Sequence, residues 1–389
     1  MDPKRFTEHK TGELQRFRNL QSGKDDWLFI PNQLPATWEF PDRFWPLLLD
    51  AREALGQLNG VGQTLADPNL LLRPLQAREA ITASAIEGTY VTPQQLLLYE
   101  LDPKEPPTGG GHAADSKEVL NYGAAVAVGR DLLQELPICG RSIRQMHQTL
   151  MAGVRGAAKQ PGQYRDIQVQ VGATGRYVPP PPAAVERLMA NLERFINGEP
   201  DNVDPLVRCC FAHYQFEAIH PFMDGNGRVG RALFALMIYS LLGHSQPWLY
   251  LSPYFEQHKE EYYDNLLRVS THGDWERWIE FCIHGITLQA KDAIRRCEEF
   301  HRIRAAYHDR MATPSRRTHA IIEMLFINPV LTIPEVRDRL SVEYHTARKD
   351  LERLVAAKIL VESPESYPRS FYAAEIMQVA FGDAGRLTS

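Results

Sequence analysis

The sequence is poor in the features that mark secreted and membrane proteins. Only five cysteines occur in 389 residues, and no two of them form a CxxC pair. This spacing argues against a zinc site and against a disulfide framework, so a reducing compartment is expected. The first residues hold no apolar signal core, and no apolar run is long enough to cross a membrane. We therefore expect a soluble cytoplasmic protein.

Neither sign of charge dominates the chain. Lys and Arg number 43 against 48 Asp and Glu, which gives a net charge of −5. Such a balance gives the whole chain no electrostatic drive toward nucleic acid. Hydrophobic residues make up 44% and charged residues 23%, as in ordinary globular proteins, and the length allows two or three domains.

The richest stretch lies between residues 220 and 231. It contains one histidine, one aspartate, an asparagine flanked by two glycines, and two arginines three residues apart. An apolar, helix-prone segment follows at 232–238. The pattern predicts a glycine-rich loop that leads into a helix. The run is His220-Pro221-Phe222-Met223-Asp224-Gly225-Asn226-Gly227-Arg228-Val229-Gly230-Arg231.

This composition favours the binding of an anion at the start of a helix. Glycines let the backbone approach a ligand closely, and free N–H groups at a helix N-terminus attract negative charge. Arg228 and Arg231 share one face of the first turn, and guanidinium groups match phosphate oxygens. Asp224 suits a hard cation such as Mg²⁺, and His220 is the only group of the run that accepts a proton near neutral pH. Together these residues suit a nucleoside triphosphate, a metal ion and a base.

The run resembles the signature of the Fic family, HPFx(D/E)GNGRxxR, and fills every position of it. The resemblance implies a protein adenylyltransferase, which moves AMP from ATP to a Ser, Thr or Tyr hydroxyl of a target protein and releases pyrophosphate. It implies that His220 is the general base and that Asp224 holds Mg²⁺ or Mn²⁺. It implies that the two arginines bind the β- and γ-phosphates. The nucleotide contacts implied by the resemblance come from His220, Gly225, Asn226, Gly227, Arg228, Val229, Gly230 and Arg231.

A second candidate residue lies at the end of a predicted helix. Apolar residues recur at helical spacing from Leu75 onward, and Gly88 is a natural helix stop. Glu87 then faces the negative end of the helix dipole, which is unfavourable. Either the glutamate is exposed and tolerates roughly a few tenths of a kcal/mol, or it has an arginine partner elsewhere in the fold.

The end of this helix is similar to the inhibitory helix of many Fic proteins, which has the pattern (S/T)xxxE(G/N). Ala83 stands at the hydroxyl position, with hydroxyl groups on either side at Thr82 and Ser84. The resemblance implies that Glu87 pairs with Arg231 and blocks productive placement of the triphosphate. It therefore predicts an autoinhibited enzyme.

A short β-hairpin is predicted between residues 167 and 178. Apolar and polar residues alternate over 167–171, and a glycine-containing turn is expected at 172–175. Residues 176–178 are expected to form the second strand. The hairpin resembles the Fic flap, which aligns a target segment by strand addition. The preceding Gly162-x-Tyr164-Arg165 run is also similar to the family. A plain surface hairpin is the alternative.

The segment at 250–263 resembles a Fic segment near the nucleotide base. The resemblance assigns Gln257 and His258 to nucleotide binding. An ordinary amphipathic helix explains the same spacing equally well.

A separate unit is predicted from about residue 313. Its expected order of helices and strands is that of a winged helix-turn-helix, with Thr332 as a helix N-cap. His345, Thr346, Arg348 and Lys349 could face a DNA groove. However, Lys and Arg show no clear excess over Asp and Glu here, so a protein-interaction or dimer module remains an alternative.

The predicted fold class is mainly α, with a Fic-type helical core, a β-hairpin flap and a small C-terminal winged helix-turn-helix domain. The first 35 residues are expected to form an extended arm. The helix that begins near Phe44 is expected to stop at residues 60–62. The expected domains are an N-terminal helical region with the inhibitory helix at 1–110, a Fic catalytic core at 111–310 and the winged domain at 311–389.

Two further functions stay open beside AMP transfer. Some Fic proteins use the N-terminal glutamate to position water for the removal of AMP from a protein. The second open function is that of a transcriptional regulator, which would bind nucleotide in the Fic pocket and DNA with its C-terminal unit. The sequence does not identify the target protein, which could be the chain itself. It also leaves open whether ATP or another nucleotide is used and whether the protein forms a homodimer.

Overall fold

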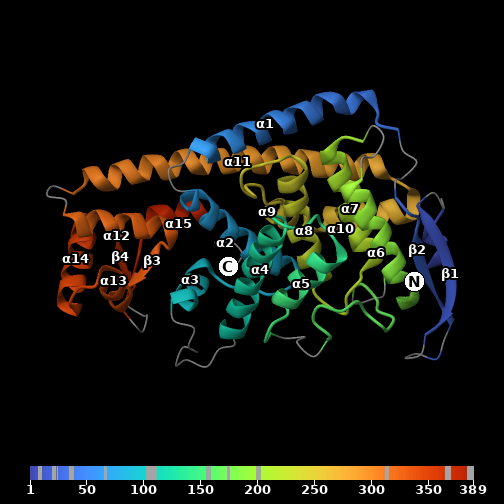
Figure 1. The fold of residues 1–389 in the computed structure, drawn as a ribbon, viewed down its shortest axis with the longest axis horizontal. Coiled ribbons are helices and arrows are strands. Elements are labelled where there is room, and N and C mark those ends of the chain that lie inside the picture. The colour runs from blue at the N-terminus through green and yellow to red at the C-terminus, as the bar shows by residue number, and fades with distance from the viewer. Residues whose placement is uncertain are drawn as a thin grey trace. The chain divides into compact units, whose positions relative to one another are not determined.

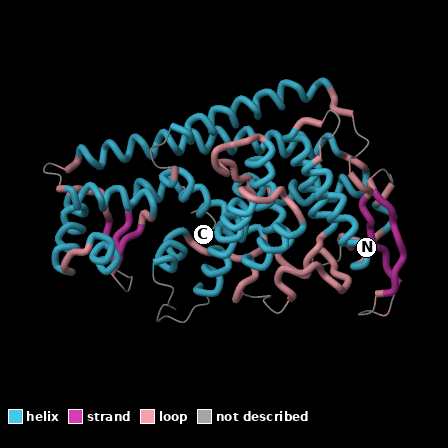
Figure 2. The backbone as a smooth tube through the Cα atoms, viewed as in Figure 1, coloured by secondary structure: helices cyan, strands magenta, loops and turns pink. Residues whose placement is uncertain are grey.

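The structure is a computed structural model, and it describes most of the chain. The described residues are 1–7, 11–19, 23, 25–34, 39–64, 68–101, 112–154, 159–172, 176–198, 203–311, 315–363 and 369–382. Helices cover most of them, and strands form one two-stranded and one three-stranded antiparallel sheet (Figure 2). The prediction of a mainly α fold is thereby confirmed.

The chain divides into two compact units. Residues 1–56 and 121–289 form the first unit, and residues 57–120 and 290–389 form the second. Three helices run from one unit into the other, namely α1 (Trp45–Thr64), α4 (His112–Leu132) and α11 (Trp275–Asp309). The three domain ranges expected from the sequence stay a prediction.

The first unit is built around two almost completely buried helices, α7 (Pro205–Ile219) and α8 (Asn226–Leu241) (Figure 1). Both are apolar nearly all round, as expected of helices at the centre of a core. They pack on each other, and α6 (Pro182–Asn197) and α10 (Lys259–His272) pack on α7 while α5 (Gly140–Leu150) packs on α8. The connection between the two central helices is the glycine-rich run.

The first residues pair as strands and do not form the extended arm that the sequence predicted. Strand β1 (Gly12–Arg18) pairs antiparallel with β2 (Asp25–Pro31). Leu28 and Phe29 of β2 are buried, and the Phe29 N–H donates to the carbonyl oxygen of Val178. The prediction was wrong because β1 is largely polar, so its sequence shows no clear alternation of apolar and polar residues.

Helix α1 also differs from its prediction, because it continues through Gly60 and Gly62 to Thr64. Neither glycine has a positive φ. Glycine lowers helix propensity by only about 1 kcal/mol and does not end a helix unless a capping geometry follows.

The second unit joins helices that are far apart in the sequence. Helix α2 (Asn69–Ile86) packs against α3 (Pro93–Leu101), α12 (Arg316–Ile327) and α15 (Ala374–Phe381). Strands β3 (Val330–Thr332), β5 (Ser370–Tyr372) and β4 (Val361–Ser363) form an antiparallel sheet in that order. Between them in sequence lie α13 (Ile333–Leu340) and α14 (Tyr344–Ala356). Thr332 caps α13, because its side chain accepts a hydrogen bond from the Glu335 N–H as predicted.

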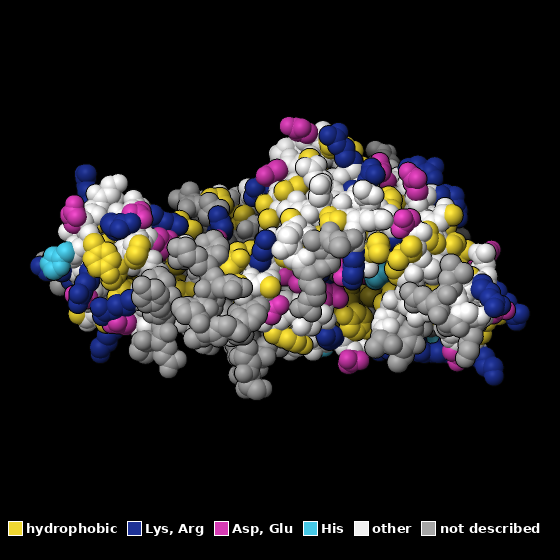
Figure 3. Space-filling model, turned by 90° about the horizontal axis from the view of Figure 1, so that it is seen from below, with side chains coloured by type: hydrophobic (Ala, Val, Ile, Leu, Met, Phe, Trp, Pro, Cys, Tyr) yellow, Lys and Arg dark blue, Asp and Glu magenta, His cyan; other side chains and the backbone are white. Residues whose placement is uncertain are grey.

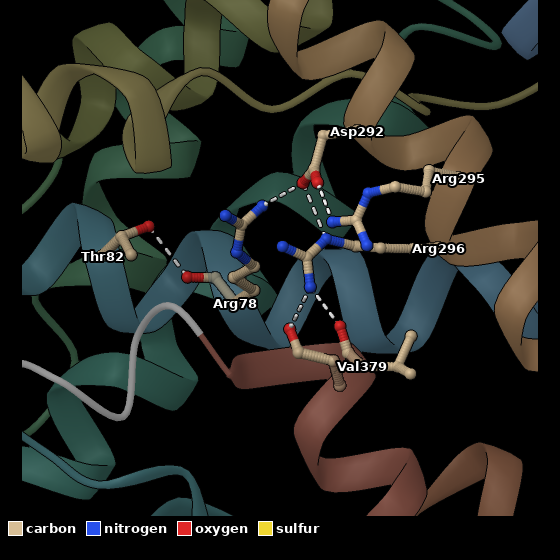
Figure 4. Close-up of polar contacts among 7 residues, drawn as sticks. Arg78, Thr82, Asp292, Arg295, Arg296 and Val379 are labelled. Atoms are coloured by element: carbon tan, nitrogen blue, oxygen red, sulfur yellow. Dashed lines mark hydrogen bonds and ion pairs between the residues drawn. The ribbon is translucent and has the colours of Figure 1, made fainter.

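A buried ionic cluster ties α2, α11 and α15 together (Figure 4). Asp292 forms ion pairs with Arg78 at 2.9 Å and Arg296 at 2.7 Å, and Arg296 also donates to the carbonyl oxygens of Val379 and Ala380. Burial raises the pKa of Asp292, but Arg296, Arg78 and Arg295 outweigh burial and hold that pKa below its usual range. The aspartate is therefore ionised, and it supports a guanidinium that caps the end of α15.

On the surface, charges of both signs lie interspersed over the face shown in Figure 3. None of the helices in the described part of the chain is long and apolar enough to span a membrane.

Candidate functional site

The glycine-rich run forms the loop between the C-terminus of α7 and the N-terminus of α8. Helix α7 ends at Ile219, and its C-cap His220 has a φ of 51° and a ψ of 62°, which lie in the left-handed region. This conformation is strained for a residue with a side chain, and such residues concentrate at functional sites. Helix α8 begins after Gly225, which also has a left-handed backbone with φ at 75°. The loop thus presents a half-buried histidine beside a helix N-terminus.

Arg165 holds the backbone of His220 in this conformation. The Arg165 side chain is buried, and its Nε donates to the carbonyl oxygen of His220 at 2.8 Å. Its Nη2 donates to the carbonyl oxygens of Pro180 at 2.6 Å and Ile219 at 3.4 Å, and its backbone N–H donates to Pro221 O. Burial lowers the pKa of Arg165 to about 10, so the guanidinium stays charged at neutral pH. A cation is favourable at a helix C-terminus, where carbonyl oxygens lack partners.

Asn226 fixes the other half of the loop. Its Oδ1 accepts from the Phe222 N–H at 2.8 Å, and its Nδ2 donates to the Phe222 carbonyl oxygen at 2.9 Å. The side chain is buried and both of its polar atoms are engaged. The side chain of Asn226 therefore shapes the loop. Of the groups that the sequence suggested for anion binding, only the backbone N–H of Asn226 is left for that role.

His147 supports the loop from α5. Its ring stacks on Phe222 with centroids 3.8 Å apart, and the Gly162 N–H donates to its Nδ1 at 2.9 Å. Because Nδ1 accepts this hydrogen bond, the neutral ring carries its proton on Nε2, which donates to the carbonyl oxygen of Asp224 at 3.0 Å. Burial lowers the pKa of His147 to about 4. The residue is a neutral positioning group that the sequence did not reveal.

Asp224 carries two different partners on its carboxylate. Oδ1 accepts from the Gly225 N–H at 2.7 Å, and Oδ2 lies 2.8 Å from the ammonium Nζ of Lys159. Burial raises the pKa of Asp224, but Lys159, the Gly225 N–H and Arg228 together hold it below its usual range. The carboxylate is therefore ionised at neutral pH.

The residues at Asp224 fit a Mg²⁺ ion that also binds phosphate. A cation, the Lys159 ammonium, already lies against a carboxylate oxygen that is partly exposed to solvent. No group of three or more His, Cys, Asp or Glu that could hold a metal occurs among the described residues. An ion at Asp224 must therefore complete its shell with phosphate oxygens and water, which is the usual arrangement for Mg²⁺.

The first turns of α8 carry two buried arginines, Arg228 and Arg231. Arg231 also affects a neighbouring core histidine: burial, and then the charge of Arg231, lowers the pKa of His213 to about 3. The N-cap residue Gly225 offers no side chain to the first N–H groups of α8. Buried guanidinium groups and uncapped N–H groups at one helix start form an anion-binding arrangement.

Comparisons with known proteins agree with this geometry. Residues 137–238 match the model of the Fic/DOC family, and residues 45–131 match the model of the Fic/DOC family N-terminal region. Residues 137–238 are therefore a Fic/DOC domain.

Curated relatives and solved structures extend the comparison. The chain is 30% identical over 169 residues to "Protein adenylyltransferase Fic" of Drosophila grimshawi and of Drosophila persimilis, which covers 43% of this chain. The alignment covers 32% and 31% of those proteins, so the chain spans about a third of the length of the curated relatives it matches. A Fic family protein from Desulfovibrio desulfuricans G20 superposes with a TM-score of 0.56 at 23% identity, covering 86% of this chain and 98% of that one. Fic-1 from C. elegans gives 0.52 at 21% identity, covering 66% and 73%.

In the second unit, Glu87 lies at the end of helix α2, as the sequence predicted. Helix α2 ends at Ile86, Glu87 is its exposed C-cap, and Gly88 follows with a φ of 90°. The hydroxyl of Thr82 donates to the carbonyl oxygen of Arg78 in its own helix at 2.8 Å. The pairing of Glu87 with Arg231 stays a prediction.

The segment at 167–178 is less regular than the predicted hairpin. Its described residues form a single antiparallel bridge, in which the Val171 N–H donates to Tyr177 O at 2.9 Å, and the turn residues 173–175 lie outside the described part. Side chains replace the strand pairing, because Gln168 Nε2 donates to Pro179 O and Arg165 Nη1 donates to Ile167 O. The alternation of apolar and polar residues in the sequence did not predict these side-chain hydrogen bonds.

The two candidates for base contact lie at the junction of α9 (Ser252–Gln257) and α10. Gln257 is exposed, and the ring of His258 lies 4.6 Å from that of Tyr254. Both belong to the same unit as the glycine-rich loop. Their contact with a nucleotide stays a prediction.

Proposed function

We propose that this chain is a protein adenylyltransferase, which moves AMP from ATP to a hydroxyl side chain of a target protein and releases pyrophosphate. The names of the curated relatives support this activity for the matched part of the chain. The observation that carries the proposal is the loop between α7 and α8. It brings one histidine, one carboxylate and two buried arginines to an uncapped helix N-terminus.

His220 is the general base of the proposed reaction. A serine, threonine or tyrosine hydroxyl is mostly protonated at neutral pH, so its attack needs a group that removes the proton. The imidazole of His220 takes this proton while the hydroxyl oxygen forms a bond to the α-phosphorus. The bond from the α-phosphorus to the bridging oxygen breaks, and pyrophosphate leaves. Arg165 contributes by fixing the backbone that carries the imidazole.

The N-terminus of α8 holds the phosphates. The N–H groups of Asn226, Gly227 and Arg228 donate to phosphate oxygens, and the guanidinium groups of Arg228 and Arg231 bind the β- and γ-phosphates. Val229 and Gly230 complete the first turn. Asp224 holds Mg²⁺ or Mn²⁺, which when bound neutralises charge on the phosphates and on the leaving group. The lowered pKa of Asp224 keeps this ligand ionised over the physiological range.

Glu87 restrains the reaction in this proposal. Its carboxylate competes with the γ-phosphate for Arg231, so the resting enzyme is slow. The position of Glu87 at the C-terminus of α2 supports this role, because the helix dipole disfavours a carboxylate there and a cationic partner would relieve it. Gln257 and His258 contact the base of the nucleotide.

The C-terminal helices and strands form a winged helix-turn-helix in this proposal, and the module contacts protein. The sheet order β3-β5-β4 with α13 and α14 between β3 and β4 supports the assignment. The arginines near its exposed face are neutralised locally: Arg348 pairs with Glu352 and Arg369 with Glu362. Paired charges give little attraction to a phosphate backbone, so a protein partner fits better than DNA.

Transfer of label from α-labelled ATP tests the proposed activity. Wild-type protein should label itself or a generic protein acceptor, and mass spectrometry should find an added AMP group. His220→Ala should abolish transfer while circular dichroism and nucleotide binding stay nearly unchanged. His345→Ala, which removes an exposed histidine of α14, is the matched control and should transfer normally. Undiminished transfer by well-folded His220→Ala would overturn the assignment of the base.

A further inference from the structure

Lys159 lies directly against the carboxylate that the proposed function assigns to the metal. Its Nζ is 2.8 Å from Oδ2 of Asp224, and 48% of the lysine side chain and 37% of the aspartate side chain are exposed. The other carboxylate oxygen is engaged by the Gly225 N–H. The ammonium therefore occupies the oxygen that a metal ion would bind first.

The backbone around the ion pair is braced by one residue. His147 accepts a hydrogen bond from the Gly162 N–H through Nδ1 and donates to the Asp224 carbonyl oxygen through Nε2. Gly162 belongs to the turn that follows Lys159, in which the Gln163 N–H donates to the Gln160 carbonyl oxygen. His147 thus holds the segment of the lysine and the segment of the aspartate at a fixed separation. The backbone therefore preorganises the contact between the lysine and the aspartate.

We propose that Lys159 competes with the divalent cation for Asp224 and so sets the metal affinity of the site. This inference rests on the proposed function, because it takes Asp224 to be the metal ligand. A divalent ion cannot share Oδ2 with an ammonium, since both are cations and Arg228 already adds positive charge nearby. Metal binding therefore requires that Lys159 leave the carboxylate.

The exposure of the pair makes this exchange feasible. Water reaches both side chains, so the lysine can be solvated when it leaves and the cation can enter without a change of fold. An exposed ion pair is worth up to about 1 kcal/mol. Removal of the competing ammonium should therefore tighten metal binding by up to about fivefold.

The experiment measures metal affinity directly with Mn²⁺ and a non-hydrolysable α,β-methylene analogue of ATP. Water-proton relaxation enhancement reports the Mn²⁺–analogue complex that is bound to the full-length protein. Lys159→Met should bind this complex more tightly than wild type, by up to about fivefold. Lys159→Arg, which keeps a cation, should remain near wild type. Lys4→Met removes an exposed lysine of the N-terminal 3-10 helix and should change nothing.

A metal-free arm separates competition from simple charge loss. Binding of the analogue in EDTA should be unchanged or weaker in Lys159→Met, because a positive charge near phosphates can only favour them. Equal or weaker Mn²⁺–analogue binding by Lys159→Met would overturn the proposed competition. Equal tightening of the metal-free analogue would overturn it as well, since the gain would not depend on the metal.

Asp224→Asn distinguishes failure of this inference from failure of the metal assignment. If Asp224 is the ligand, Asp224→Asn should weaken Mn²⁺–analogue binding strongly, and Lys159→Met should bring no gain in that background. If Asp224→Asn binds the complex as wild type does, the metal assignment of the proposed function is wrong, and the role of Lys159 falls with it.

Discussion

The Nε of Arg165 donates a hydrogen bond to the backbone carbonyl oxygen of His220 at 2.8 Å. This contact joins the segment at the base of the flap to the C-terminus of α7, where the backbone takes a left-handed conformation. The same guanidinium also binds carbonyl oxygens of Ile167 and Pro180. One buried cation therefore couples the position of the proposed base to the position of the flap.

Replacing Arg165 should damage catalysis even though the residue does not reach the substrate. Arg165→Lys keeps the charge but cannot serve carbonyl oxygens in several directions, so kcat should fall by about 100-fold from misplacement of His220. Arg165→Met should also lower the free energy of unfolding by about 3 kcal/mol, because buried carbonyl oxygens lose their donors.

Steady-state AMP transfer and urea unfolding measure both effects. Arg18→Met is the control, because Arg18 lies on β1 with 69% of its side chain exposed, and it should change neither quantity. Wild-type kcat in Arg165→Lys would contradict the positioning role.

The buried His147 should make the protein sensitive to acid. Its pKa is about 4 in the folded protein and 6.5 in the unfolded chain, so between these values the unfolded state binds more protons. Stability should therefore fall as the pH drops from 6.5 to 4, by about 3 kcal/mol in all from this residue. His213, with a pKa of about 3, extends the loss to lower pH.

His147→Gln offers an amide N–H in place of Nε2–H and does not titrate. Its unfolding free energy, measured in urea at several pH values between 7 and 4, should show a flatter slope than that of wild type. Parallel curves for the two proteins would contradict the assignment of a buried neutral histidine.

Removing the carboxylate of Glu87 should activate AMP transfer. Glu87→Gly frees Arg231 for the γ-phosphate without adding bulk, so the rate should rise at least about 10-fold above wild type, as expected for loss of a charge-assisted pair. The same change should weaken any removal of AMP, if Glu87 also positions water.

The double variant provides the internal control for Glu87. Arg231→Ala should transfer slowly whether or not Glu87 is present, since the phosphate contact is missing in both cases. An unchanged or lower rate in Glu87→Gly would mean that Glu87 is not inhibitory, and Ala83 in place of a hydroxyl residue would be the first suspect.

The metal ligand can be tested through activity as well as binding. Asp224→Asn removes the charge but preserves the size of the side chain, so transfer should fall by at least about 100-fold. EDTA should abolish wild-type transfer, and added Mg²⁺ or Mn²⁺ should restore it. Full activity in EDTA would contradict a metal at Asp224.

The two neighbouring arginines of α11 should differ sharply in their effect on stability. Arg296 is buried between Asp292 and the carbonyl oxygens at the end of α15, whereas the side chain of Arg295 is 59% exposed and contacts the same aspartate. Arg296→Met should lower the unfolding free energy by about 3 kcal/mol, and Arg295→Met by less than about 1 kcal/mol. Thermal unfolding of both variants checks this, and equal losses would contradict a structural role for the buried pair.

The sequence by itself determined the residues of the loop and the local caps. Glycines and arginines around Asn226 specify a turn into a helix N-terminus through backbone conformation and short-range hydrogen bonds. Gly88 after Glu87 and Thr332 before α13 likewise act within a few residues, so their positions could be predicted.

Only the tertiary structure decided what holds that loop. Arg165 reaches His220 across 55 residues, Lys159 reaches Asp224 across 65, and His147 reaches the Asp224 backbone across 77. No periodicity or spacing marks such partners, because they depend on which segments the packing of α5, α7 and α8 brings together. The N-terminal hairpin was not predicted for a related reason. The apolar residues of β2 are buried only because the strand packs against the rest of the first unit, which the sequence does not show.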